Sequence, residues 1–202
     1  SGRTRLLAAL GDIVERTGGR VLRATSAEGE RSLFLHPILS MISTIILSTA
    51  PDLIPDLLGP RLGTAAELVP ELREVCTVGP YQRAVADLEH RGALQTVAHV
   101  ISTTAARQPV LMVLDDLHHA GSSTVDALLW LIRELPAVPL MIVASVQSDQ
   151  RDPLLIELIA RSRHVELRPL GEERVAALAR EAGFPDDAAV VWELTRGHLL
   201  FV

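Results

Sequence analysis

The feature that most constrains this sequence is the apolar run at residues 110–114, which ends in the paired acids Asp115 and Asp116. A strand that is apolar at every position is typical of a parallel sheet whose two faces are both covered by helices. Further short strands are predicted at residues 21–24, 140–144 and 165–167. Because these strands alternate with segments of helical periodicity, the sequence predicts an α/β fold with a parallel sheet.

Helix boundaries are indicated by capping residues and by glycines. Residues 31–107 are expected to be mostly helical, and Ser123 with Asp126 three residues later predicts a capping box. Further helix starts are expected at Asp152-Pro153 and Asp186, and helix ends at Gly18, Gly183 and Gly197. The last two helices have no strand between them. We therefore expect a core at residues 1–168 and the start of a helical lid at residues 169–202.

Composition narrows the class of protein. The formal net charge of −6 argues against direct DNA binding by this segment. The single cysteine, Cys76, excludes an internal disulfide and favours a cytoplasmic location. Residues 33–50 are apolar, but polar residues interrupt them and Pro37 lies near their start. A buried helix that begins at Pro37 is therefore expected, and no membrane segment.

Two patterns point to phosphate chemistry. An apolar strand that ends in paired acids is a Walker B pattern, in which Asp115 would hold Mg²⁺ and Asp116 would polarise the attacking water. The alternative is an ordinary strand end with solvated acids. Gly2, Arg3 and Thr4 open a helix like the end of a phosphate-binding loop, with Thr4 as a second Mg²⁺ ligand. The alternative for them is an ordinary helix start.

Polar residues at 145–147 follow the strand at 140–144. Ligands of α/β sheets bind beyond the carboxyl ends of the strands, so Gln147 is a candidate for contact with the γ-phosphate. An ordinary loop residue is the alternative. His118 and His119 are interpreted as loop residues because adjacent histidines point in different directions and no third metal ligand stands at useful spacing.

Several stretches together resemble the STAND-type P-loop ATPase domains of large LuxR-family bacterial transcriptional regulators. Where that family shows a GKTRLL-like loop, LDDLHWAD, LLLVGTYR, LPLSEEEVAAL and TGGNPLFV, this chain reads SGRTRLLAAL, LDDLHHAG, LMIVASVQ, LRPLGEERVAAL and LTRGHLLFV. The order and spacing of these stretches agree along nearly the whole chain.

The resemblance implies an ASCE-type P-loop NTPase sheet flanked by helices that binds ATP or ADP with Mg²⁺. It implies that a first strand and the front of the phosphate-binding loop precede Ser1, so that this chain is expected to be part of a longer protein and to bind nucleotide poorly by itself. It further implies self-association of that parent protein, with its DNA-binding domain elsewhere. Gly197 belongs to the closing motif, which the resemblance places near the adenine.

Departures from the family pattern concern the positive charges. Arg3 stands where the family has Lys, and Gln147 where it has Arg. Gly121 and Leu199 replace the family's Asp and Pro. Arg and Lys are not equivalent at a tight phosphate site, so hydrolysis is expected to suffer more than binding. Three functions stay open: a nucleotide switch with slow hydrolysis, a competent ATPase, and a pseudo-ATPase scaffold without nucleotide.

Overall fold

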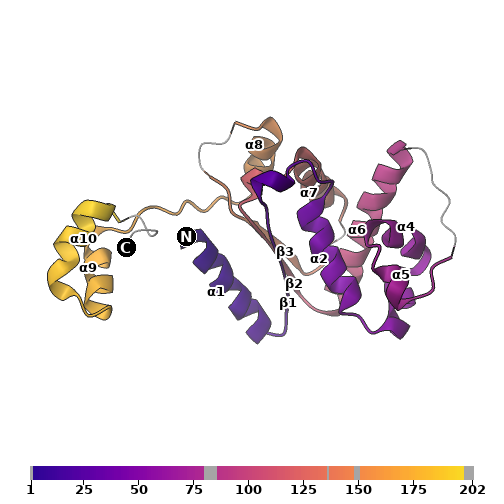
Figure 1. Cartoon of the computed structure of the whole chain (residues 1–202), viewed down its shortest axis with the longest axis horizontal. Helices are drawn as coiled ribbons and strands as arrows, with labels where there is room; N and C mark the ends of the chain where they lie inside the picture. The colour runs from indigo at the N-terminus through magenta and orange to yellow at the C-terminus, as the bar shows by residue number, and fades with distance from the viewer. Residues whose placement is uncertain (1, 80–85, 136, 148–150, 198–202) are drawn as a thin grey trace. The chain divides into compact units, whose positions relative to one another are not determined.

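The computed structural model describes residues 2–79, 86–135, 137–147 and 151–197. They contain one sheet of three parallel strands, β1 (Arg20–Thr25), β2 (Val110–Asp115) and β3 (Leu140–Ala144), in the order β1-β2-β3. Figure 1 shows the three strands side by side with helices around them. The predicted α/β fold with a parallel sheet is therefore confirmed.

The strand β2 lies at the centre of this sheet, which explains its unbroken apolar sequence. In the register of the sheet, Val110 lies between Arg20 and Leu140, and Leu114 lies between Ala24 and Ala144. All residues from 110 to 114 are buried, whereas the outer strands are only partly buried. A strand with neighbours on both sides and cover on both faces must be apolar throughout.

Helices connect and flank the strands. The α-helices are α1 (Gly2–Arg16), α2 (His36–Leu47), α3 (Ile54–Leu58), α4 (Leu62–Leu68), α5 (Leu72–Val75), α6 (Ala86–Arg107), α7 (Ser122–Glu134), α8 (Pro153–Ala160), α9 (Glu172–Glu181) and α10 (Ala188–Thr195). Short 3-10 helices are η1 (Glu28–Glu30), η2 (Pro51–Leu53), η3 (Gly59–Arg61), η4 (Leu117–His119) and η5 (Pro185–Asp187). The long segment between β1 and β2 is mostly helical, as predicted.

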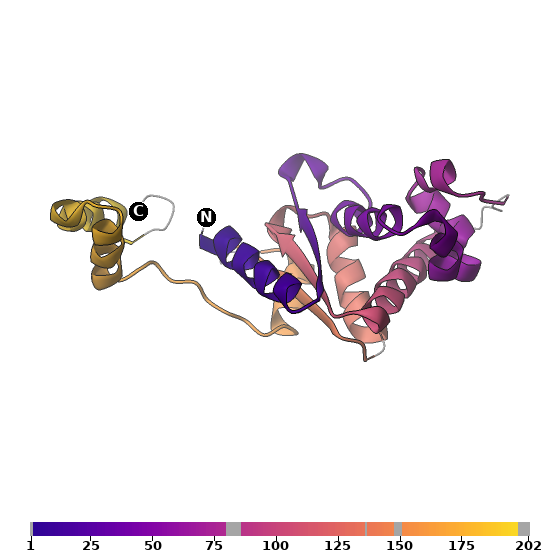
Figure 2. The same cartoon turned by 90° about the horizontal axis from the view of Figure 1, so that it is seen from below.

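The helix α2 forms the centre of the apolar core. It packs against β1, α6 and α7, and Figure 2 shows it lying beside the sheet. Its inward side chains are almost completely buried: Ile38, Met41, Ile42, Ile45 and Ile46. Pro37 lies in its first turn, so the predicted buried helix is confirmed. In the described part of the chain, no single helix is long and apolar enough to cross a membrane. The helix α2 and residues 51–68 reach the required length and hydropathy only when they are taken together, and this pair is bent by 112°.

The predicted strand at residues 165–167 is wrong. These residues have no regular structure, and the side chains of Val165 and Leu167 are 69% and 46% exposed. A β-strand is stable only where its N–H and C=O groups pair with a neighbouring strand. Within the described residues, the sheet contains only β1, β2 and β3, so this segment pairs with none of them.

Helix caps were predicted with mixed success. Asp152 caps α8 as expected, because its Oδ1 accepts hydrogen bonds from the N–H groups of Leu154 at 2.9 Å and Leu155 at 3.4 Å. The capping box at Ser123 is wrong, since Gly121 is the N-cap of α7 and no side chain caps that helix. Asp186 is also not a cap, because it lies inside η5.

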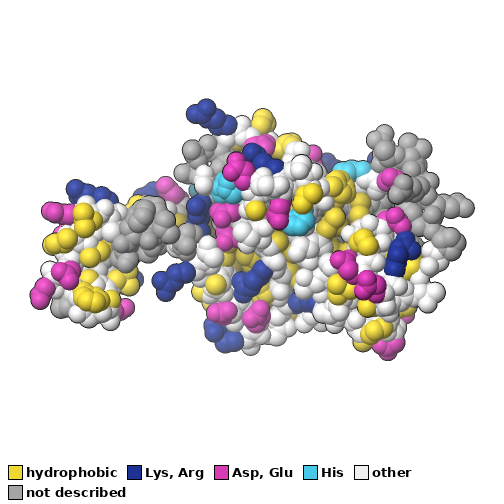
Figure 3. Space-filling view, viewed as in Figure 1, with side chains coloured by type: hydrophobic (Ala, Val, Ile, Leu, Met, Phe, Trp, Pro, Cys, Tyr) yellow, Lys and Arg dark blue, Asp and Glu magenta, His cyan; other side chains and the backbone are white. Residues whose placement is uncertain are grey.

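The structure groups the chain into two compact units, residues 10–162 and residues 1–9 with 163–202, and α1 contributes to both. In the second unit, α9 packs against α10 and η5. The sequence-predicted boundary at residue 168 stays a prediction. Figure 3 shows acidic and basic side chains interspersed on the face in view, as the small net charge suggests.

Candidate functional site

The paired acids lie where β2 leaves the sheet. Asp115 is the last residue of β2, and Asp116 follows it with a left-handed backbone at φ 53° and ψ 43°. Aspartate adopts this conformation more readily than most residues because its short polar side chain can bond to nearby backbone. The left-handed residue turns the chain sharply from the strand into η4, and leaves both carboxylates at the carboxyl end of the sheet.

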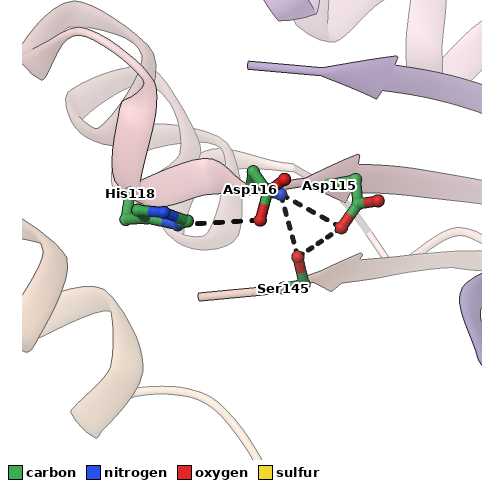
Figure 4. Close-up of polar contacts among 4 residues, drawn as sticks. All are labelled: Asp115, Asp116, His118 and Ser145. Carbon is green, nitrogen blue, oxygen red and sulfur yellow. Dashed lines mark hydrogen bonds and ion pairs between the residues drawn. The ribbon is translucent and has the colours of Figure 1, made fainter. Parts of the chain in front are cut away.

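The hydroxyl of Ser145 connects the two acids (Figure 4). Ser145 Oγ donates a hydrogen bond to Asp115 Oδ1 at 2.5 Å, and it accepts one from the Asp116 N–H at 2.8 Å. The same N–H also donates to Asp115 Oδ1 at 3.1 Å. Hydrogen bonds to an ionised carboxylate are shorter and stronger than those between neutral groups. The orientation of Asp115 and the backbone of Asp116 are therefore fixed by one residue, which directly follows the neighbouring strand β3.

The backbone of Ser145 takes part as well. Its N–H donates to the carbonyl of Leu114 at 2.9 Å, and its carbonyl accepts from the N–H of Leu117 at 2.9 Å. Ser145 is only 6% exposed. The backbone and the hydroxyl of Ser145 thus join the ends of β2 and β3 by hydrogen bonds that are shielded from solvent.

The carboxylate of Asp116 faces His118, as Figure 4 shows. His118 Nδ1 lies 4.0 Å from Asp116 Oδ1, and the His118 side chain is only 5% exposed. The rings of His118 and His119 are in tilted contact, with centroids 4.0 Å apart. A buried imidazole beside a half-exposed carboxylate restricts the orientations open to that carboxylate. His118 is therefore part of this site, although the sequence indicated only a loop residue.

The paired acids fit a Mg²⁺ site in which the protein supplies only part of the metal's ligands. The described residues contain no cluster of three or more His, Cys, Asp or Glu side chains that would hold a metal by themselves. Mg²⁺ does not need such a cage, because it usually keeps several waters and binds one or two carboxylates together with phosphate oxygens. Asp115, a carboxylate fixed at the carboxyl end of β2, meets that requirement.

The other predicted site residues have separate positions. Gly2, Arg3 and Thr4 form the first turn of α1, and the N-terminus of a helix favours anions. Gln147 lies beyond β3 and is exposed. The structure places Asp115 and Asp116 at the carboxyl end of β2, and the roles of all the predicted site residues in binding stay predictions.

Gly197 has a structural explanation of its own. Its φ is 75°, a region that favours glycine, and its carbonyl accepts a hydrogen bond from the Leu170 N–H at 2.9 Å. A Cβ at this position would collide with the Leu170 backbone. The backbone alone therefore requires a glycine here, and contact with adenine stays a prediction.

Sequence reasoning missed Ser145 as a site residue because it gave the role at this strand end to Gln147. The signal lies in the strand register, which only the folded chain shows. Leu114 pairs with Ala144, so the next residues along each strand, Asp115 and Ser145, lie opposite each other. Residues directly opposite in neighbouring strands are in contact range, and a hydroxyl beside a carboxylate forms a hydrogen bond.

Comparison with known protein families identifies a family that this chain matches. The model of the AAA ATPase domain family matches residues 1–143, which run from the first helix to β3 and include both acids. Ser145 and Gln147 lie just beyond the matched range. No curated protein and no solved structure matches the chain.

Proposed function

This chain belongs to the AAA ATPase domain family, and from that premise we propose that it is a regulatory nucleotide switch that binds ATP or ADP with Mg²⁺. The observation that carries the proposal is the pair Asp115 and Asp116 at the carboxyl end of the buried central strand, fixed by the Ser145 hydroxyl. In an α/β sheet this edge is where ligands bind. Asp115 would hold Mg²⁺, and Asp116 would orient the attacking water.

The proposed switch hydrolyses ATP slowly. Arg3 stands where the resembled phosphate-binding loop has Lys, and Gln147 stands where an Arg is expected. Removing one charge contact to the transferring phosphoryl group lowers the hydrolysis rate by orders of magnitude. Ground-state binding of the nucleotide depends less on these contacts. A long-lived ATP state suits a switch better than it suits an enzyme built for turnover.

We further propose that the switch serves a LuxR-type transcriptional regulator in the cytoplasm. This finer proposal is supported by the stretches LDDLHHAG, LRPLGEERVAAL and LTRGHLLFV and by their spacing. In such a protein the nucleotide state would control self-association, and DNA would be bound by a different domain.

Calorimetry on the natural protein that carries this sequence tests nucleotide binding. We expect ATP and ADP to bind, with ATP affinity dependent on Mg²⁺. Asp115→Ala should remove the Mg²⁺ dependence, because the metal loses its protein carboxylate. Asp52→Ala is the matched control, since Asp52 is an exposed acid in η2 and should leave binding unchanged.

Two results would contradict the switch. If the folded protein binds neither nucleotide, the chain is a pseudo-ATPase that acts as a scaffold for protein contacts. If Asp115→Ala and Asp52→Ala behave alike, nucleotide binds elsewhere and the paired acids have no part in it.

A further inference from the structure

Residues 26–35, which join β1 to α2 and are called the strap below, lie along the turn that carries the paired acids. At one end, the Ser26 N–H donates to the backbone carbonyl of Asp115 at 3.0 Å. At the other end, the Leu35 N–H donates to the hydroxyl of Ser123 at 3.3 Å. Between these points the Arg31 carbonyl lies directly against Gly121. These three contacts come in the same order along both segments, so the strap runs alongside the turn from Asp115 to Ser123.

The contact at Gly121 exists only because this residue has no side chain. A Cβ on Gly121 would lie 3.3 Å from the carbonyl carbon of Arg31 and would collide with its oxygen. The backbone of Gly121, with φ −69° and ψ 158°, is one that any residue adopts. Glycine is therefore required here because the strap lies so close, and not because of the backbone conformation at this position. Gly121 is also the N-cap of α7, where Ser, Thr, Asp or Asn would supply a capping hydrogen bond.

The contact at Leu35 holds a residue in an unfavourable conformation. Leu35 has φ 51° and ψ 19°, which is left-handed, and its side chain is completely buried. Residues with a bulky side chain rarely adopt this region, and they remain there only where the surroundings fix them. The Ser123 hydroxyl and the apolar core together provide that constraint. The end of the strap is therefore anchored where α2 begins.

We propose that the strap positions Asp116. The strap acts through its contacts with two positioning residues, Gly121 and Ser123. The proposal rests on the function proposed above. The Asp116 carboxylate faces His118 in η4, and η4 lies between Asp116 and Gly121. A displaced strap therefore shifts the side chain beside which this carboxylate is oriented. The Asp115 carboxylate is held by the Ser145 hydroxyl, and the strap contacts this residue at its backbone carbonyl. A loosened strap should therefore slow hydrolysis and leave the affinity for Mg²⁺ and ATP unchanged.

The test combines single-turnover ATP hydrolysis, calorimetry and amide hydrogen exchange on the natural full-length protein. In Gly121→Ala, we expect the hydrolysis rate to fall ~10- to 100-fold, the range for small misplacements of a catalytic group, with the ATP Kd unchanged. The amides of Leu35 and Leu117 should exchange faster without nucleotide, because the first reports the strap and the second reports the turn. Ser122→Ala, a change at an exposed neighbour, should match the wild type.

A second pair of variants guards against a general folding defect of Gly121→Ala. Ser123→Ala removes the acceptor of the Leu35 N–H and should reproduce the slower hydrolysis, whereas Ser123→Thr keeps a hydroxyl and should restore the wild-type rate. The proposal is overturned if Leu35 exchanges faster while Leu117 and the hydrolysis rate stay unchanged. It is also overturned if Ser123→Thr is as slow as Ser123→Ala.

The same measurements distinguish failure of the proposed function from failure of the strap proposal. A wild-type protein that binds no ATP contradicts the switch, and the exchange of Leu35 and Leu117 then decides the strap alone. Faster exchange of both amides in Gly121→Ala would support positioning of the turn. Unchanged exchange of Leu117 would refute it.

Discussion

At the scale of single residues, Ser145 is the side chain that joins the two acids of the site. Its hydroxyl bonds to both acids, so Ser145→Ala removes a hydrogen bond to a carboxylate and one acceptor for the Asp116 N–H. We expect a loss of about 1–3 kcal/mol in the free energy of unfolding, measured by urea denaturation, and weaker dependence of ATP binding on Mg²⁺. Ser145→Thr keeps the hydroxyl and is the matched control. Equal stability of the alanine variant and the wild type would show that the hydroxyl does not fix the acids.

The same scale shows how much of the candidate site could be predicted from the sequence. Asp115 and Asp116 could be found because a charged pair directly after an apolar strand contrasts strongly with its surroundings. Ser145 and His118 could not, because their roles depend on neighbours 30 and 2 residues away whose distances only the folded chain defines. A serine after a strand is common, and only its register opposite Asp115 makes it part of the site.

At the scale of secondary-structure elements, the cap of α8 gives a direct test of local sequence effects. Asp152 Oδ1 accepts two backbone N–H hydrogen bonds at the start of this eight-residue helix. Asp152→Ala should lower the free energy of unfolding by about 1 kcal/mol, as measured by urea denaturation. Asp152→Asn keeps the acceptor oxygen and should lose much less. An equal loss in Asp152→Asn and Asp152→Ala would mean that charge, and not capping, determines the effect.

The elements also show why part of the fold could not be predicted. The strands β1, β2 and β3 and the helix α2 follow from runs of apolar residues that local chemistry alone explains. The segment at 165–167 alternates apolar and charged residues, as a strand can, but it has no partner strand among the described residues. A strand requires a suitable sequence and also a partner. Ser123 looks like a cap in sequence, yet its hydroxyl accepts a hydrogen bond from Leu35, a residue far away in the chain. Local patterns cannot include such distant partners.

At the scale of the whole molecule, the stability of the unit at residues 10–162 should depend on the core around β2. Two methionines on neighbouring strands allow a matched comparison. Met112 on β2 is completely buried and belongs to the main apolar core, whereas Met141 on β3 is 54% exposed. Met112→Ala removes buried methylene groups and leaves a cavity, so we expect a loss of about 2–5 kcal/mol in the free energy of unfolding. Met141→Ala should change it by less than about 0.5 kcal/mol, as exposed substitutions usually do. Urea denaturation of both variants measures the difference.

Similar losses in the two variants would mean that the exposed face of β3 is covered in the natural protein, because only a buried methionine can contribute that much.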